Sequence, residues 1–533
     1  MAPSKFGSKF RHIYHKMRIL KKIAIVALSL ILLLVLANYG VSYYISKKLP
    51  SILKKEKDFP YNVSYTNLDI DVLGGSFIMR NAALAPKDSI AAAVKNGIFG
   101  QIESIGVSGI SLWQFFKNDR IVARSVTIDK PEIIIYHREK KYNIESDIEK
   151  PFRQAIQTGS LTITRGNFKM LDEKKGFKLK ASNINFNLYK IKVDSTTVDD
   201  NVPVRYRDYR LSCDSLFYDA GPYYTITANK INSTDSTLAI NNFKMLPKQS
   251  RKQFSNSLPK ELDQFNLKAQ DISIPKLDWG FIRDTLYVHT PQVVLNKIDA
   301  NIYRSKEPAD DPSRKKLYSE LLRSLKFDLK VDKLLIKNSL VVYEEQLNFS
   351  KPAAKVSFSK FYATAANIYS PVNKGKLPRT TIDVECLFMK SAPLKVNWSF
   401  STPDVSDAFT ITGRLQNIRS EEVNPVSKPL MNATTTGDLN DVRFVFNGNR
   451  ENATGTFSID YDDLKVGIYK KDGKKKNKVV SALGNLLVKN DTDGELKKVN
   501  VAVDRSKDKS VFNFLWKFVM QGLKQTVLPK IVT

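Results

Sequence analysis

Residues 394–400 read Leu-Lys-Val-Asn-Trp-Ser-Phe, a strict alternation of apolar and polar side chains. Successive side chains of a β-strand point to opposite faces, so this pattern predicts a strand with one apolar face and one face in water. Half-buried strands of this kind are typical of antiparallel sheets. The same alternation recurs in 68–72, 183–188 and 457–461. The sequence therefore predicts a mainly β protein with few helices.

The strand-rich region also repeats itself. Four short segments match in the same order at offsets between 160 and 173 residues: 81–86 with 242–247, 113–115 with 279–281, 126–135 with 286–295, and 161–163 with 334–336. The alternative is the general similarity of strand-rich segments, but four matches in order favour an internal duplication. We expect a first β-rich unit at 46–200, a second at 201–375, and a C-terminal β-rich region at 376–509. Pro131 and Pro291 should each mark a bulge, bend or edge, because proline removes a ladder donor.

Helical periodicity is rare. Residues 315–325 carry a stripe of four leucines, and 148–158 form a weaker candidate with Pro151 in its first turn. A third helix is predicted at 511–528, because Ser510 is a good N-cap and Pro529 stops the helix.

The predicted C-terminal helix, followed by a short tail to residue 533, has a broad apolar face and a narrow polar stripe. One interpretation is a helix docked on the sheet as part of the core. The other is a lid over a groove, or a helix lying in a membrane interface. The residues we assign to the lid or interfacial face are Phe512, Leu515, Trp516, Val519 and Leu523.

The N-terminal region predicts a membrane anchor. Residues 23–37 are apolar except for Ser29, and the apolar character continues far enough for a helix to cross a bilayer. Seven Lys and Arg residues and no acid precede this stretch, which favours a cytoplasmic N-terminus. The stretch is long for a cleaved signal peptide or a buried core helix, and 38–41 is a poor cleavage site. We therefore expect a basic cytoplasmic tail at 1–18 and an uncleaved transmembrane signal anchor at 19–45, with the bulk of the chain on the far side.

The net charge of +30 indicates an anionic partner. Nucleic acid is a common partner of such chains, but the predicted topology makes anionic lipid headgroups more accessible. A basic surface that is merely solvated remains an equal alternative. Only Cys213 and Cys386 occur, which excludes a disulfide scaffold.

No catalytic or metal-binding motif is found. His137 and His289 have no Cys or Glu at metal-ligand spacing. Asp69 and Asp71 lie two apart on one strand face, where a solvated pair is far commoner than a shared proton or cation. Nucleophile elbows, phosphate loops and zinc-protease motifs are absent from the sequence. We therefore expect no enzyme activity, no metal and no cofactor.

One ordered series of segments covers most of the chain: the anchor, 63–71, 77–81, 126–135, 161–168, 455–466 and 510–517. In this order they resemble the AsmA-like family of Gram-negative envelope proteins (AsmA/TamB class), and the last two segments resemble its Bacteroides-type branch. The resemblance implies an inner-membrane anchor and a periplasmic, elongated antiparallel β-sheet curled into an apolar groove. It also implies a role in moving phospholipid toward the outer membrane or in keeping that membrane's lipid balance.

A curled sheet with one apolar face can shelter acyl chains, since each CH₂ removed from water contributes about 0.8 kcal/mol. We expect Ile133, Ile135, Val293 and Leu295 to face the apolar interior, as a lipid groove or as closed core. The leading hypothesis is a lipid-binding or lipid-transfer protein of the cell envelope, with phospholipids, the membrane surface and other envelope proteins as partners. The alternatives are a structural or assembly factor that carries no lipid and, more weakly, an exported hydrolase.

Overall fold

A computed structural model describes residues 61–87, 97–111, 120–136, 155–172, 176–193, 204–282, 284–372, 374–469 and 491–527, with isolated positions at 35, 38, 39, 114, 197 and 202. The basic tail at 1–18, nearly all of the expected anchor at 19–45, and His137 lie outside the described residues. Within them, no helix has the length and apolar character needed to cross a membrane.

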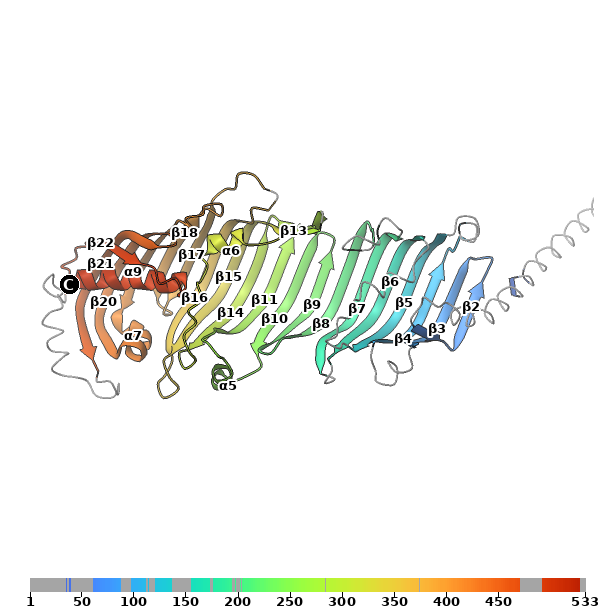
Figure 1. Cartoon of the computed structure of the whole chain (residues 1–533), viewed down its shortest axis with the longest axis horizontal. Coiled ribbons are helices and arrows are strands. Elements are labelled where there is room, and N and C mark those ends of the chain that lie inside the picture. Colours follow the sequence, from blue (N-terminus) through green and yellow to red (C-terminus); the bar gives the residue numbers. More distant parts are fainter. Residues whose placement is uncertain are drawn as a thin grey trace, which may run out of the picture. The chain divides into compact units, whose positions relative to one another are not determined.

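The chain forms two compact units, Met1–Arg210 (unit 1) and Leu211–Thr533 (unit 2). The described strands of unit 1 are β1 (Tyr61–Ser64), β2 (Asn67–Asp71), β3 (Ser76–Pro86), β4 (Gly97–Ser108), β5 (Arg120–Tyr136), β6 (Ala155–Leu171) and β7 (Phe177–Val193). At the boundary β8 (Asp208–Ala220) begins, and unit 2 continues with β9 (Tyr224–Thr234), β10 (Thr237–Pro247), β11 (Gln264–Pro275), β12 (Asp278–Ile282), β13 (Thr285–Thr290), β14 (Val293–Ser305), β15 (Asp328–Gln346), β16 (Ala354–Tyr369), β17 (Thr380–Phe388), β18 (Ala392–Phe400), β19 (Phe409–Arg419), β20 (Ala433–Gly448), β21 (Asn452–Ile468) and β22 (Lys497–Asp504). The prediction of a mainly β protein is confirmed (Figure 1).

The sheets are mixed, so the expectation of an antiparallel sheet was wrong in part. In unit 1, β5 and β6 pair parallel. The other described pairings of this unit are antiparallel: β3 pairs with β1, β2 and β4, β4 also pairs with β5, and β6 pairs with β7. In unit 2, β13 and β14 both pair parallel with β15. Parallel neighbours need a long crossover; in unit 2 this is residues 306–327, and in unit 1 the residues between β5 and β6 lie outside the described part of the chain. Alternation shows that a strand is half-buried, but it does not show the direction of the neighbouring strand.

The two units repeat one pairing order. Neighbouring strands pair in the order antiparallel, antiparallel, parallel, antiparallel in two series. The first series is β3, β4, β5, β6 and β7, and the second is β10, β11, β14, β15 and β16. Left-handed residues stand at matching places within four strands of each series, at Asn81, Lys130, Arg165 and Asn183 in unit 1 and at Asn242, Lys297, Asn338 and Lys360 in unit 2. We call these positions the bulge row, because the ladder is interrupted there and a bulge bends a strand.

The positions of the bulge row show that the sequence comparison misaligned β5 with β14. Ile128 pairs with Ile163, and Leu295 pairs with Ile336, so Leu295 corresponds to Ile128. The sequence comparison instead matched Leu295 with Ile135, seven residues away. The bulge adds one unpaired residue and so changes which residues of the strand face the apolar side. An alignment shifted by an odd number of residues across the bulge therefore still matches apolar with apolar positions, and the pattern alone does not reveal the error. Pro131 lies directly after the left-handed Lys130, and Pro291 separates β13 from β14, as expected of both prolines.

The described helices are α5 (Arg251–Asn256), α6 (Tyr318–Arg323), α7 (Asn424–Met431) and α9 (Val511–Val527), with a 3₁₀ turn at Ser420–Val423. The predictions at 315–325 and 511–528 are confirmed by α6 and α9. The helix predicted at 148–158 was wrong for 155–158, which belong to β6 and pair with β5. Cross-strand pairing outweighs the weak helical pattern of this segment.

The main described core of unit 2 forms where α9 lies across β20–β22 (Figure 1). Phe514 and Phe518 are almost completely buried, and their rings lie 5.1 and 4.9 Å from that of Phe446. Gly522 permits the close approach of the helix, because a Cβ there would lie 2.3 Å from Cγ of Phe457. The C-terminal helix is therefore part of the core on its inner side.

Candidate functional site

Two rows of apolar side chains cross the sheet of unit 2. Members of a row are cross-strand neighbours, and the two rows lie two residues apart along each strand, so they share one face. The first row is Ile240, Ile272, Leu295, Ile336, Ala363, Val384, Val396, Gly413, Phe444, Phe457 and Val499. The second row is Val293, Leu334, Ala365, Ile382, Trp398, Ile411, Phe446, Gly455 and Val501.

The C-terminal end of both rows is closed by α9 and by residues 306–327, the crossover from β14 to β15, which we call the strap. Leu317 of the strap is 2% exposed and belongs to the same core cluster as Phe446 and Phe457. Tyr318 packs edge-on against Trp398, with ring centroids 5.0 Å apart. From Ile382 and Val396 onward, the rows are therefore packed core.

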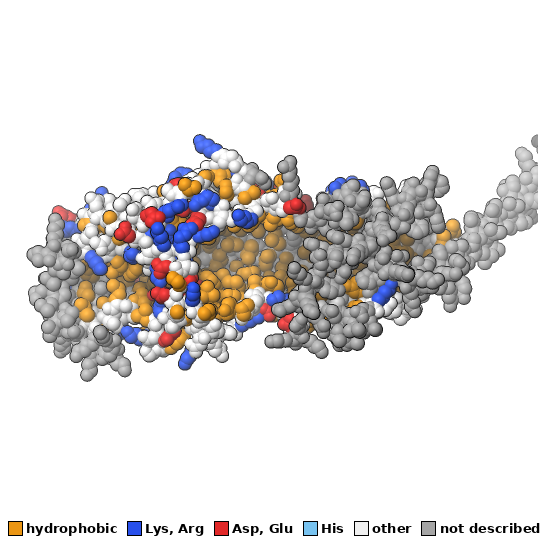
Figure 2. Space-filling view, viewed as in Figure 1, with side chains coloured by type: hydrophobic (Ala, Val, Ile, Leu, Met, Phe, Trp, Pro, Cys, Tyr) orange, Lys and Arg blue, Asp and Glu red, His pale blue; other side chains and the backbone are white. Residues whose placement is uncertain are grey.

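The same rows continue beyond this cover. Val293, Leu295, Leu334 and Ile336 are half-buried and lie outside the core cluster. Figure 2 shows a hollow lined by hydrophobic side chains beside the group of charged residues on the visible face of unit 2. We call the part of the two rows on β10, β11, β14, β15 and β16 the apolar trough. Its side chains are of the kind against which an apolar chain would pack.

Val293 and Leu295, two of the residues predicted from sequence, therefore lie side by side in the trough. Ile133 and Ile135, the other two, are half-buried in unit 1. Ile133 stands in a row with Leu84, Gly100 and Phe168, and its Cδ1 lies 2.9 Å from where a Cβ of Gly100 would be. Because Ile133 follows the bulge row and Leu295 precedes it, the two pairs do not occupy equivalent positions.

The residues assigned from sequence to the lid or interfacial face of the C-terminal helix do not share one environment in the structure. Phe512 is 61% exposed and Trp516 is 45% exposed. Leu515, Val519 and Leu523 are partly buried and pack against the core cluster. The most deeply buried side chains of α9 are Val511, Phe514 and Phe518, which sequence reasoning did not single out. A helix with apolar residues on more than half of its circumference has no unique inner face in its sequence.

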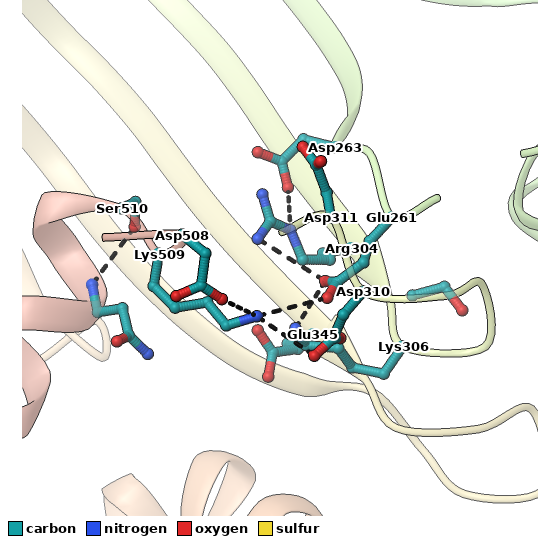
Figure 3. Close-up of polar contacts among 12 residues, drawn as sticks. Glu261, Asp263, Arg304, Lys306, Asp310, Asp311, Glu345, Asp508, Lys509 and Ser510 are labelled. Carbon is teal, nitrogen blue, oxygen red and sulfur yellow. Dashed lines mark hydrogen bonds and ion pairs between the residues drawn. The ribbon is translucent and has the colours of Figure 1, made fainter. Parts of the chain in front are cut away.

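Charged residues fasten α9 and the strap to the start of β11 (Figure 3). The side chain of Glu261 is 3% exposed, and its carboxylate lies 2.6 Å from Nζ of Lys306 and 3.8 Å from Nζ of Lys509. Arg304 donates to Asp263 at 2.7 Å. Burial lowers the pKa of Arg304, but the bond to Asp263 outweighs this and holds the pKa above its usual value. These pairs fix the N-terminal end of α9 beside the strap.

The other polar residues singled out from sequence have structural partners. Asp69 lies 3.6 Å from Arg80, and Asp71 accepts from the backbone of Gly74. His289 lies 3.2 Å from the buried carboxylate of Asp328, which also pairs with Lys374. Both cysteines, Cys213 and Cys386, are free and buried. Across the described residues, no group of three or more His, Cys, Asp or Glu side chains is placed to hold a metal ion.

A shallow pocket over β17–β20 is bordered by charged side chains, which include Glu385, Lys395, Arg414 and Arg443. Lys395 pairs with Glu385, and both arginines pair with Asp441 at 2.6 Å. Each of these cations therefore already has an acidic partner, although the two arginines share one carboxylate, and the trough remains the stronger candidate site. No known protein family matches the chain, and no curated protein shows significant similarity to it, so its function has to be argued from the arrangement of its own side chains.

Proposed function

We propose that this chain is an AsmA-like protein, anchored in the inner membrane with its bulk in the periplasm. In this proposal the apolar trough binds or transfers phospholipid and so contributes to outer-membrane lipid homeostasis. The observation that supports it is the continuation of two apolar rows from the packed core into half-buried positions at Val293, Leu295, Leu334 and Ile336. Apolar residues at these positions are not required by the core that lies beneath α9 and the strap.

The energetics of an acyl chain suit such a surface. Each CH₂ that leaves water contributes about 0.8 kcal/mol, so a chain that buries several of them gains affinity without any directional contact. This explains how a protein with no recognisable catalytic or metal motif can still have a ligand. It also favours a ligand class defined by its apolar chains rather than by one headgroup.

The repeated register extends the proposal to both units. If the units descend from a duplication, each sheet provides an equivalent apolar surface of its own. The matched rows that support this are Met79, Ile105, Ile128, Ile163 and Phe186 in unit 1 and Ile240, Ile272, Leu295, Ile336 and Ala363 in unit 2.

The second candidate is a structural or assembly factor of the cell envelope that carries no lipid. It is favoured by the C-terminal end of the rows, where the same apolar face is closed core under α9. Native mass spectrometry of residues 46–533, purified without detergent, distinguishes the two. Phospholipid that co-purifies with the protein and is lost in an Ile336→Asp variant supports lipid binding, whereas a mass equal to the bare chain supports the second candidate.

A further inference from the structure

Arg505 is a buried arginine that follows β22 directly. The residue is 7% exposed, and its Nε is buried with no hydrogen-bond partner among the described residues. Its Nη2 donates to the backbone carbonyl of Lys315 in the strap, and its own backbone N–H donates to the carbonyl of Glu451 at 2.9 Å. The main chain of Arg505 is thus fixed against Glu451, and its guanidinium is held by one bond to the strap, with part of its donor capacity unused.

The carboxylates around Arg505 are engaged by other cations. Asp407, which is completely buried, pairs with Arg323 at 2.7 Å and with Arg450 at 3.3 Å. Glu320 pairs with Arg314, and Glu451 pairs with Lys507 at 2.6 Å. Among the described residues, no ion pair joins Arg505 to an acid. In this respect it differs from each of the arginines that surround it.

A buried cation without a directly paired acid is costly, because the protein interior does not replace its hydration. Burial lowers the pKa of Arg505 and the positive charge of Arg314 lowers it further, while the carboxylates of Asp407, Glu320 and Glu451 act in the opposite direction without reversing the shift. Figure 2 shows Lys and Arg side chains, with some Asp and Glu side chains among them, gathered on the visible face of unit 2. An anion that reached this place would meet an oriented donor in a group that contains more cations than acids.

We propose that Arg505 is the centre of a site for a phosphate-bearing ligand at the contact between the strap and the segment that joins β22 to α9. A guanidinium suits this ligand, since its planar set of N–H donors matches the oxygens of phosphate. The headgroup of a phospholipid and free phosphate share this chemistry. The site goes beyond the proposed lipid trough, because it can be occupied whether or not an acyl chain lies in the trough.

Thermal unfolding of the full chain in a neutral detergent tests the site at constant ionic strength. Inorganic phosphate, in place of chloride, is expected to raise the Tm of the wild type in a saturable way. In Arg505→Gln the dissociation constant for phosphate should rise by about tenfold or more, as for the loss of a charge-assisted hydrogen bond. Without phosphate, the same variant should match or exceed the Tm of the wild type, because an unpaired buried charge has been removed.

Two variants serve as controls. Lys316→Gln removes an exposed charge from the strap and should respond to phosphate as the wild type does. Arg505→Lys keeps the charge but loses the planar set of donors, so an intermediate response is expected, and this variant decides the matter if Arg505→Gln does not fold. A wild type that does not respond to phosphate, or an Arg505→Gln or Arg505→Lys protein that responds as strongly as the wild type, would overturn the proposal.

The two sources of phosphate are separated by mixed micelles that contain phosphatidylglycerol or, as a phosphate-free control, diacylglycerol. Stabilisation by phosphatidylglycerol that depends on Arg505 assigns the site to lipid headgroups, whereas a response to inorganic phosphate alone assigns it to a free anion. Diacylglycerol that stabilises the wild type and Arg505→Gln as well as phosphatidylglycerol does, with no response to inorganic phosphate, would refute the anion site. That last result would leave lipid binding by the trough standing.

Discussion

A charge placed at two points of the same apolar row should have two different effects. Phe457 lies in the closed part of the first row and is 0% exposed beneath α9, whereas Ile336 is half-buried in the trough. Truncating a buried phenylalanine costs about 3–5 kcal/mol, and Phe457→Asp also buries an unpaired carboxylate. Against a total stability of about 5–15 kcal/mol, this variant should lose the C-terminal fold. Ile336→Asp gives up only part of a side-chain burial worth about 1.5–3 kcal/mol, so its fold should survive.

Urea unfolding followed by tryptophan fluorescence measures the two stabilities, and native mass spectrometry measures retained lipid. Ile336→Asp should unfold at nearly the wild-type urea concentration but retain little lipid. Lys333→Asp is the matched control, because Lys333 is exposed on the same strand and on the opposite face. If Ile336→Asp unfolds as readily as Phe457→Asp, the trough is closed core and the reasoning is refuted.

Three further predictions concern stability. Phe518→Ala should lower the free energy of unfolding by about 3–5 kcal/mol in urea titrations, because Phe518 is fully buried; a cost below about 1 kcal/mol would show that α9 is not core. Gly455→Ala should lower the Tm strongly, since its Cβ would lie 1.8 Å from the carbonyl oxygen of Val445, whereas Gly106→Ala, with nothing within 4 Å, should change little. Burial raises the pKa of Asp441, but two arginines outweigh this and hold the pKa at about 2. Asp441 therefore stabilises the fold fully above the unfolded-state pKa near 3.9, and this contribution is lost as the pH falls from about 4 to 2. Asp441→Asn should therefore cost about 1 kcal/mol at pH 6, after a discount for the half-exposed arginines, and the difference should shrink toward pH 2; a pH-independent difference would contradict the assignment.

Strand content was predictable because alternation is local. Residues 394–400 and 457–461 carry their own pattern, and both form strands in the structure. The strap helix and α9 were predictable for the same reason, through their apolar spacing. The short helix α5 also had a sequence signal in Ser250 and Gln253, which form a capping box, but six residues are too few for periodicity to show.

What the sequence could not predict are the relations between distant segments. The parallel partners of β5 and β14 depend on crossovers, and a period of two contains no information about them. The sequence comparison matched Leu295 with Ile135 instead of Ile128. The one residue inserted by the bulge lets an alignment that is wrong by seven residues still match apolar with apolar positions. Phe514 and Phe518 were missed because the choice of inner face on α9 depends on the sheet beneath it. Arg505 was missed because its lack of an acidic partner is visible only in three dimensions.

Photo-crosslinking from single positions in the full-length chain tests the central claim most directly. A photoreactive amino acid replaces Leu295 or Ile336 in the trough, or Lys333 on the opposite face, and the protein is crosslinked in its own membranes before its mass is measured. The account predicts adducts with the mass of a phospholipid at Leu295 and Ile336 and few or none at Lys333. Adducts that are absent from both trough positions, or equally frequent at all three, would contradict it.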